Sequence, residues 1–211
     1  MHFNDDSAQC RLATTAQDMD HVYRLRYACY LRKGAIAENE DQRFSDEYDL
    51  LPNHFSFLVE GAGEALATVR ISVVQPALGW VKSPSAKVFG DHAAYQCMAS
   101  ESFVEASRLC FHEQARRDVL FRLVANMAAL ADRYDTKWLL ACPRAEHSHM
   151  YQRLFGFKVM APARQYFGVN FQTELLGTER EELRAAGRRV APIQRAWNAA
   201  TGALLTVAQA A

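Results

Sequence analysis

The stretch SFVEASRLCF (residues 102–111) decides how this chain is expected to fold. It is rich in apolar and small residues, as buried β-strands are. Side chains alternate between the two faces of a strand, so Glu105 and Arg108 would lie on opposite faces. Both charged side chains can therefore serve one site only if a β-bulge interrupts the strand between them.

Helices and strands alternate downstream of this stretch. Apolar residues at helical spacing predict a helix over about 116–134, and the short apolar strand KWLLAC (137–142) follows it. A second helix is predicted over about 147–155, ending at Gly156. The segments FKVM (157–160) and QYFGVNFQTELL (165–176) are predicted to pair as strands. This alternation predicts an α/β (α+β) fold with a mixed central sheet.

A helix and a strand pair are predicted upstream. Thr15 is a candidate N-cap, with Asp18 three residues later, for a helix that ends at Gly34. The segments HFSFLVE (54–60) and EALATVRISVV (64–74) alternate as strands do, and Arg70 belongs to the polar face of the second. Residues 75–101 contain several Pro and Gly residues, and a connection of this length is usually a lid or an unrecognised element.

Size and composition predict one globular domain over residues 1–176 and a helical C-terminal extension over 177–211, with a capping-box pattern from Thr178 to Glu181. Lys plus Arg and Asp plus Glu both total 24, so no net charge draws the chain to nucleic acid. No signal peptide or transmembrane run is recognisable, which predicts a cytoplasmic protein.

Metal and disulfide sites are not expected. The five cysteines include no C-x-x-C pair and are predicted to be reduced and mostly packed. His147 and His149 lie two residues apart, which is not the i, i+4 spacing of a helical metal pair.

Several charged and aromatic residues form an ordered set along the chain. Each has an ordinary explanation when taken alone, such as an exposed helix residue or a solvated loop residue. Together, their order and spacing over about residues 12–176 resemble the acyl-homoserine lactone (autoinducer) synthases and the N-acyl amino acid synthases, which belong to the GNAT superfamily of N-acyltransferases. A family associated with exosortase protein sorting also resembles the pattern. The set comprises Arg26, Tyr27, Tyr30, Asp46, Asp49, Arg70, Glu105, Ser107 and Arg108.

The resemblance implies a sheet whose fourth and fifth strands, here 102–111 and 137–142, separate to hold the pantetheine arm of an acyl donor. It also implies the bulge within 102–111. The segment YQRLFGFKV (151–159) is similar to the aromatic, Gly-Phe ending that the superfamily places before its final strands.

The implied chemistry is acyl transfer from a thioester to an amine. Glu105 would accept the amine proton, and backbone N–H groups from Ser107 to Leu109 would stabilise the oxyanion beside the bulge. Arg70 or Arg108 would pair with the carboxylate of an amino acid acceptor. The remaining substrate-binding candidates are Arg26, Tyr30, Asp46 and Asp49, with Phe103, Val124, Met127, Leu139 and Ala141 for the acyl pocket.

Departures from the family pattern bear on the substrates. The Gly-rich loop that holds coenzyme A pyrophosphate is absent, since Arg108 is followed by LCFHEQARRD (109–118), and this favours phosphopantetheine on acyl carrier protein over acyl-coenzyme A. Arg116 and Arg117 are candidates for binding donor phosphate at a helix N-terminus. Ile36 stands near the position of an autoinducer-synthase tryptophan, which disfavours S-adenosylmethionine. No tightly bound cofactor is expected.

Three hypotheses follow. The first is an N-acyl amino acid synthase with a long-chain acyl donor. The second is an acyl-homoserine lactone synthase, and the third is a GNAT-fold protein that binds an acyl group or its carrier without turnover. The presence of Glu105 argues against the third, because a binding protein has no need of a base.

Overall fold

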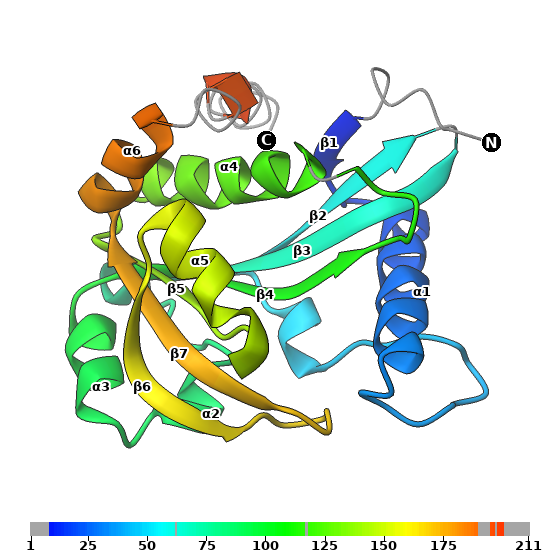
Figure 1. The fold of residues 1–211 in the computed structure, drawn as a ribbon, viewed down its shortest axis with the longest axis horizontal. Helices are drawn as coiled ribbons and strands as arrows, with labels where there is room; N and C mark the ends of the chain where they lie inside the picture. The colour runs from blue at the N-terminus through cyan, green and yellow to red at the C-terminus, as the bar shows by residue number, and fades with distance from the viewer. Residues whose placement is uncertain (1–8, 62, 117, 190–194, 197, 201–211) are drawn as a thin grey trace.

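The computed structural model describes residues 9–61, 63–116, 118–189, 195–196 and 198–200. These residues form one seven-stranded sheet in the order β1-β2-β3-β4-β5-β7-β6, with helices on both faces (Figure 1). The β4–β5 pair is parallel, and the other neighbouring pairs are antiparallel. The mixed α/β prediction is therefore confirmed.

The elements have the following bounds. The strands are β1 Gln9–Leu12, β2 His54–Gly61, β3 Glu64–Val74, β4 Phe103–Phe111, β5 Trp138–Ala141, β6 Lys158–Gln165 and β7 Gln172–Glu179. The helices are α1 Ala16–Arg32, α2 Ala86–Phe89, α3 Ala93–Ser100, α4 Asp118–Arg133, α5 Ser148–Phe155 and α6 Arg180–Arg189. Short 3-10 turns are η2 Glu47–Leu50, η3 Pro76–Leu78 and η4 Ala145–His147. Among the described helices, none has the length and apolarity to cross a bilayer.

The start of α1 is capped as the sequence predicts. The Thr15 hydroxyl accepts the Asp18 backbone N–H, and the Asp18 carboxylate accepts the Thr15 backbone N–H in return. This reciprocal pair satisfies two N–H groups that the first turn leaves without helical partners. The helix ends at Arg32, just before Gly34, whose φ is +61°.

Two apolar cores lie on opposite faces of the sheet. Alternate residues of β4, β5 and β7 separate them: Val104, Leu139 and Leu176 belong to the first, and their neighbours Phe103, Leu140 and Leu175 to the second. The first core packs under α4 and α5 and includes Leu123, Met127, Phe155 and, from α6, Leu183. The second packs under α2 and α3 and includes Phe89, Tyr95 and Met98.

Helices α1 and α4 both pack on strands β2 to β4. Figure 1 shows α4 above these strands and α1 at their other side. The face of β3 toward α1 carries Thr68, Arg70 and Ser72, all fully buried. A polar layer is therefore enclosed between the sheet and α1.

A β-bulge interrupts β4 where the family resemblance implies one. Arg70 of β3 pairs with Ser107, and Thr68 pairs with Cys110, so Arg108 and Leu109 together lie opposite Val69. Arg108 has a φ of +54°, in the left-handed region that a non-glycine residue rarely adopts. The predicted bulge is confirmed, and Arg108 turns to the same face as Arg70.

Strands β4 and β5 separate after a short parallel pairing. Their register runs from Phe103 opposite Trp138 to Ala106 opposite Ala141, and no later pair joins them among the described residues. The predicted gap between the fourth and fifth main strands is confirmed.

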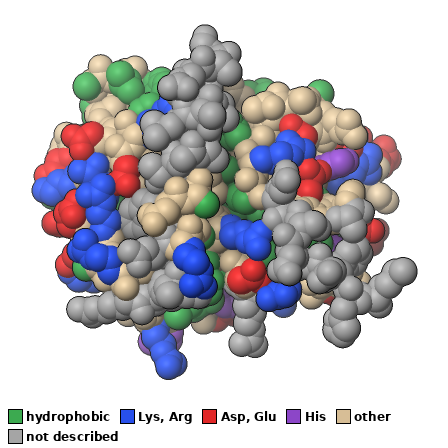
Figure 2. Space-filling view, turned by 90° about the horizontal axis from the view of Figure 1, so that it is seen from above, with side chains coloured by type: hydrophobic (Ala, Val, Ile, Leu, Met, Phe, Trp, Pro, Cys, Tyr) green, Lys and Arg blue, Asp and Glu red, His purple; other side chains and the backbone are tan. Residues whose placement is uncertain are grey.

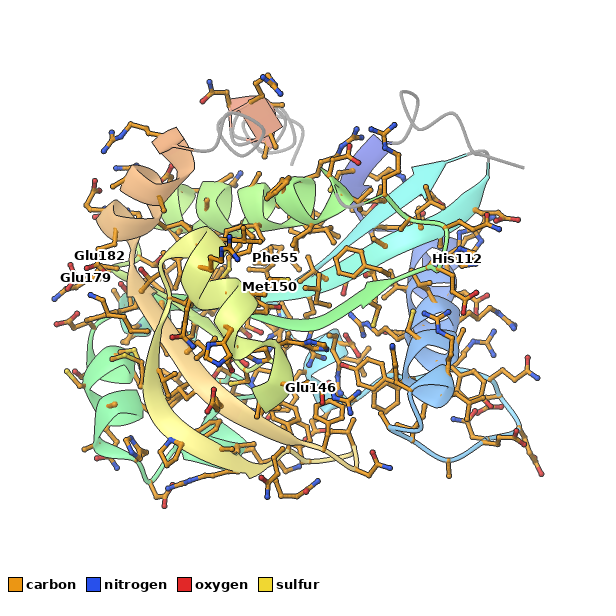
Figure 3. All side chains as sticks on the ribbon, in the orientation of Figure 1. Phe55, His112, Glu146, Met150, Glu179 and Glu182 are labelled. Carbon is orange, nitrogen blue, oxygen red and sulfur yellow. The ribbon has the colours of Figure 1, made fainter. Side chains whose placement is uncertain are left out.

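Three boundaries differ from the sequence prediction. Residues 75–101, which carry no clear pattern, contain η3, α2 and α3. Within QYFGVNFQTELL, residues 166–171 form the turn between β6 and β7 instead of strand. The predicted capping box at Thr178 is wrong, because β7 continues through Glu179 before α6 begins. Glu179 and Glu182 lie together at this junction (Figure 3), and the Thr178 hydroxyl donates to the Glu182 carboxylate.

Candidate active site

A buried ion-pair network lies on the polar face of the sheet. Arg26 Nη1 donates to Asp49 Oδ1 at 2.8 Å, and Arg70 Nη1 lies 3.1 Å from the same oxygen. Arg70 also donates through Nη1 and Nη2 to the two oxygens of Asp46, at 2.5 and 3.1 Å. Arg108 Nη2 donates to Asp46 Oδ2 at 2.7 Å. Five residues from α1, the loop before β2, β3 and β4 are thus joined.

The turn η2 holds the two aspartates in place. Asp46 is its N-cap, and Asp46 Oδ1 accepts the Tyr48 N–H at 3.0 Å. Asp49 Oδ2 accepts the Asp46 N–H, also at 3.0 Å. The D-x-x-D spacing in the sequence is therefore a capping box, and each carboxylate both caps the turn and binds an arginine.

Burial and the arginines act in opposite directions on these carboxylates. Burial raises the pKa of Asp46, but hydrogen bonds from Arg70 and the charges of Arg70 and Arg108 outweigh it and lower the pKa below the usual range. The pKa of Asp49 is lowered in the same way, with Arg26 and Arg70 overcoming the burial penalty. Both carboxylates are therefore ionised at neutral pH.

Arg108 is surrounded by aromatic rings. Its guanidinium carbon lies 4.5 Å from the Phe44 ring centroid and 5.6 Å from that of Tyr30. Tyr166 and Phe167, from the β6–β7 turn, contribute rings at 6.0 and 5.8 Å. This turn also reaches the segment just after α1, where the Asn170 N–H donates to Ala35 O. The aromatic contacts and the Asp46 ion pair together compensate for the strained backbone of Arg108.

Glu105 lies outside the ion-pair network. Its side chain is fully buried, and its Oε2 accepts the Ser85 hydroxyl at 2.6 Å. The Ser85 backbone N–H lies 3.2 Å from both carboxylate oxygens. Within the described part of the chain, Glu105 forms no ion pair, although it shares a face of the sheet with Arg70. Burial raises the pKa of Glu105, while Ser85 and the charge of Arg70 lower it.

An apolar cavity lies on the opposite face of β4. It has a volume of about 20 Å³. Of the predicted acyl-pocket residues, Val124, Met127 and Ala141 line it, while Leu139 packs in the adjoining core. Phe103 is in the second core, edge-on to Tyr95, so its assignment to this pocket is wrong. The other lining residues are Val69, Ala106, Leu109, Leu123, Tyr151, Phe155 and Phe157.

The carboxylate and the cavity are adjacent to the same gap. Glu105 and Ser107 belong to the face of β4 that carries Arg70, and Ala106 belongs to the cavity face. Beyond Ala106 and Ala141 the strands are no longer paired, so a ligand in the gap can reach both faces. A carboxylate therefore lies on one side of this strand end and an apolar cavity on the other.

Other predicted residues have different surroundings. Arg70 is fully buried, and its Nε, Nη1 and Nη2 are engaged with Ser107, Asp46 and Asp49, which leaves it a framework role. Arg116 is largely exposed and pairs with Asp118 at the start of α4. Arg117 lies outside the described residues.

Sequence reasoning missed several site residues. Ser83, Ser85 and Tyr95 come from the unassigned stretch 75–101, and isolated serines carry no pattern that distinguishes them. Phe44 is recognisable from the sequence only as a loop aromatic, and Tyr166 and Phe167 only as residues of a predicted strand. The fold brings all three to Arg108.

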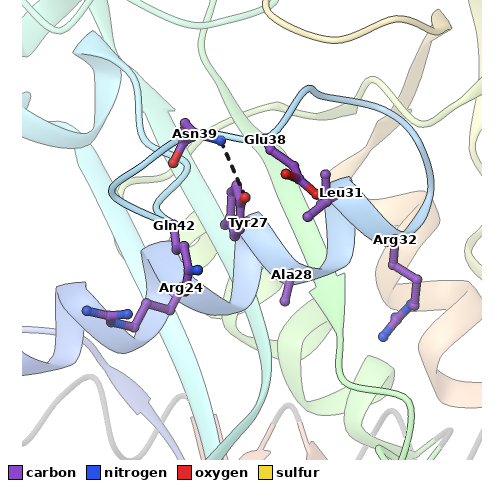
Figure 4. Close-up of a pocket in the computed structure, with 8 residues that line it drawn as sticks. All are labelled: Arg24, Tyr27, Ala28, Leu31, Arg32, Glu38, Asn39 and Gln42. Atoms are coloured by element: carbon purple, nitrogen blue, oxygen red, sulfur yellow. Dashed lines mark hydrogen bonds between the residues drawn. The ribbon is translucent and has the colours of Figure 1, made fainter.

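Two open grooves lie away from this network. One, of about 630 Å³, lies between α1 and the loop that follows it, where the Asn39 N–H donates to the Tyr27 hydroxyl at 3.4 Å (Figure 4). The other, of about 640 Å³, is lined by Cys10 of β1, by residues in and just before α4, and by Arg195, Ala196, Ala199 and Ala200. Neither includes an ion-pair network residue or Glu105 in its lining. In the described part of the chain, no cluster of His, Cys, Asp and Glu side chains is arranged to bind a metal.

Comparison with known proteins places these features in context. A family model described as N-acyl amino acid synthase FeeM matches residues 21–179. The solved structure of FeeM, an N-acyl amino acid synthase from uncultured soil microbes, is 15% identical, with a TM-score of 0.70 over 85% of this chain and 94% of that chain. None of the curated proteins matches this chain in sequence.

Two acyl-homoserine lactone synthases also share the fold. The synthase LasI is 14% identical, with a TM-score of 0.61 over 85% of this chain and 93% of its own. The coenzyme A-dependent synthase BjaI is 13% identical, with a TM-score of 0.57 over 90% and 97% of the two chains.

Proposed function

The chain belongs to the N-acyl amino acid synthase FeeM family and is an N-acyltransferase, and from this premise we propose that it acylates the amine of an amino acid. The observation that carries the proposal is the arrangement across the β4–β5 gap. A buried carboxylate lies on one face and an apolar cavity on the other. The acceptor binds on the Glu105 face, and the acyl chain enters on the α4 face.

Glu105 makes the amine nucleophilic. The amine nitrogen attacks the thioester carbonyl carbon, the C–S bond breaks, and Glu105 takes the proton that the nitrogen loses, directly or through water. The thiolate that leaves regains a proton, so the products are an amide and a free thiol. Backbone N–H groups of the bulge at Arg108 and Leu109 are the donors for the oxyanion.

The acyl cavity must enlarge to accept a long chain. Its volume of about 20 Å³ gives room for about one water molecule, far less than a long acyl chain needs. Met127, whose unbranched side chain repacks easily, and Tyr151 line it. Movement of these side chains between α4 and α5 would open a channel through the first core.

Acyl carrier protein is the donor we propose, because the Gly-rich pyrophosphate loop is absent after Arg108. Its phosphopantetheine arm would enter the β4–β5 gap. The reaction requires no metal or resident cofactor in this scheme, and a cytoplasmic location supplies acyl carrier protein.

The test is a product assay. The purified protein is incubated with equal concentrations of dodecanoyl acyl carrier protein or dodecanoyl-coenzyme A and a mixture of the common amino acids, and products are separated by mass spectrometry. We expect an N-dodecanoyl amino acid, formed faster from the carrier protein. A faster rate from coenzyme A would overturn the donor assignment. A homoserine lactone formed from S-adenosylmethionine, with no N-acyl amino acid, would overturn the acceptor assignment.

A further inference from the structure

We propose that Ser85 is a positioning residue for Glu105, and that a hydrogen-bond chain from Tyr95 through Ser83 to Ser85 fixes the orientation of this carboxylate. The proposal rests on the proposed function, in which Glu105 takes the proton of the acceptor amine. It assigns an active-site role to the connection between β3 and β4, which lies outside the ion-pair network.

The chain consists of short contacts between buried groups. Tyr95 Oη and Ser83 Oγ lie 3.0 Å apart, and Ser83 Oγ and Ser85 Oγ also lie 3.0 Å apart. Ser85 Oγ then lies 2.6 Å from Glu105 Oε2. Ser83, Ser85 and Glu105 are each at most 1% exposed and Tyr95 is 5% exposed, so these four groups have little access to water.

An ionised Glu105 gives this chain one direction. A carboxylate only accepts hydrogen bonds, so the Ser85 hydroxyl must donate to it. Ser85 Oγ then has no proton for Ser83 and accepts from it, and Ser83 in turn accepts from Tyr95. Burial raises the pKa of Tyr95 to about 12, so Tyr95 keeps its proton at working pH and remains the donor at the end of the chain. Aligned bonds of this kind strengthen one another in a buried site.

Ser85 holds the carboxylate at two points. Its hydroxyl binds Oε2, and its backbone N–H lies between the two oxygens. Among the described contacts, Oε1 accepts only this shared N–H, so it keeps acceptor capacity for a proton from the substrate. A carboxylate held in this way has little freedom to rotate, which is what a general base of fixed direction requires.

The electrostatic surroundings make the Ser85 contact important. Burial disfavours the charged form of Glu105 and raises its pKa, while hydrogen bonds from Ser85 and Ser83 and the charge of Arg70 act in the opposite direction. Four other titratable groups interact with Glu105 among the described residues. They are the neutral phenols of Tyr48, Tyr95 and Tyr166 and the thiol of Cys142. Without a direct ion pair, the hydrogen bonds from Ser85 are the main local contacts that stabilise the anion.

The experiment compares Ser85→Ala, Ser83→Ala and Tyr95→Phe with wild type. Ser100→Ala is the control, because Ser100 lies on α3 in the same connection but its exposed hydroxyl donates to Cys97 O instead of to this chain. A hydrogen bond to a charged group has a free energy that corresponds to about one to two pKa units. We therefore expect Ser85→Ala to move the acidic limb of the kcat profile up by one to two pH units, with a smaller shift for Tyr95→Phe.

The KM for the acyl donor should change less than twofold in Ser85→Ala, while kcat at neutral pH falls about tenfold or more. The control should keep the wild-type profile. A Ser85→Ala profile identical to wild type, in a variant with the wild-type circular dichroism spectrum, would overturn the proposal.

A second readout is independent of turnover. In protein labelled with carbon-13 at the glutamate side-chain carboxyls, the Glu105 signal is identified by its loss in Glu105→Gln and titrated in wild type and in Ser85→Ala. A raised pKa in Ser85→Ala supports the positioning role, and an unchanged pKa contradicts it. If wild type forms no product in any acyl transfer assay, the proposed function fails while this titration still decides whether Ser85 stabilises the anion.

Discussion

Glu105 and Arg70 lie on the same face of the sheet, but their side chains have different partners. Glu105 is bound by Ser85, whereas Arg70 is bound by Asp46, Asp49 and Ser107. Replacement of Glu105 should therefore affect mainly activity, and replacement of Arg70 should affect mainly stability.

Glu105→Gln should lose activity much more than stability. No arginine loses a direct partner, so the stability cost comes from a buried amide facing the Ser85 N–H, about 1 to 3 kcal/mol. Loss of the base should lower kcat by about 10²- to 10⁴-fold. Higher pH should restore part of the rate, because more of the amine is then neutral. Thermal melting and pH–rate profiles check this, and near-normal turnover at neutral pH would remove Glu105 from the chemistry.

Arg70→Lys, in contrast, should lose stability more than activity. A lysine keeps the charge but cannot reproduce the planar contacts with both oxygens of Asp46, so we expect a loss of about 3 kcal/mol in the free energy of unfolding. Arg24→Lys is the matched control, because Arg24 is exposed and its ion pair among the described residues is with Asp20 on α1. Urea unfolding measures both. Equal stabilities with a raised acceptor KM would instead show that Arg70 binds substrate.

His54 makes the stability of the protein depend on pH. Burial, followed by the charge of Arg70, lowers the pKa of His54 to about 4. The folded state then binds fewer protons than the unfolded state, whose histidine has a pKa of about 6.5, so stability is full above pH 6.5 and falls as pH decreases toward 4. We expect a loss of about 1 to 2 kcal/mol from this residue, since His54 keeps some solvent exposure. Urea unfolding at pH 7 and pH 5 should show a smaller difference in His54→Gln than in wild type.

At the scale of elements, the bulge of β4 is the feature on which the site depends. The bulge directs the Arg108 side chain to Asp46, and it requires Arg108 to adopt a left-handed backbone conformation that is strained for a non-glycine residue. Arg108→Gly and Arg108→Ala both remove the ion pair, but only glycine adopts this backbone without strain. The glycine variant should therefore be more stable than the alanine variant by about 1 kcal/mol, a comparison made by urea unfolding. Equal stabilities would mean that the backbone at residue 108 relaxes in both.

The sequence predicts these elements to different degrees. The cap of α1 and the strand pair β2–β3 follow from local rules, because Thr15 and the Gly61–Gly63 turn each carry their own signal. The bulge follows from the family resemblance, because the Glu105–Arg108 spacing alone does not require one. The role of Ser85 follows from neither, because it depends on α2 and α3 folding back over β4. The alternation of side chains along β4 also leaves open which of the two cores the Phe103 side chain enters, because it does not say which core lies on which face of the sheet.

At the scale of the whole molecule, a formal net charge of zero produces no overall field of one sign. Acidic and basic side chains are interspersed on the face seen in Figure 2, as expected for a net charge of zero. The second core and the polar layer are enclosed by segments far apart in the chain. Leu183 of α6 packs in the first core, so the predicted C-terminal extension begins within the domain.

The five thiols are free, and they differ in exposure. Cys97 is exposed, Cys29 and Cys110 are buried, and Cys10 and Cys142 are intermediate. Burial also raises the pKa of Cys10 to about 12 and that of Cys142 well above its usual value, which leaves little thiolate. We expect a single fast phase with a colorimetric disulfide reagent in the native protein. Cys97→Ser should abolish it, and a fast phase that remains would show that another thiol is accessible.

Because the β4–β5 pairing is short, the two halves of the sheet are joined by few backbone hydrogen bonds. Four register pairs join two antiparallel blocks, β1 to β4 on one side and β5, β7 and β6 on the other. Within the described sheet these four pairs are the only backbone pairing between the blocks, while the side chains of both apolar cores span them. A substrate bound between β4 and β5 would contact both blocks and would restrict their motion relative to each other. The two blocks would then move less relative to each other while the substrate is bound, and they would regain that motion when the product leaves.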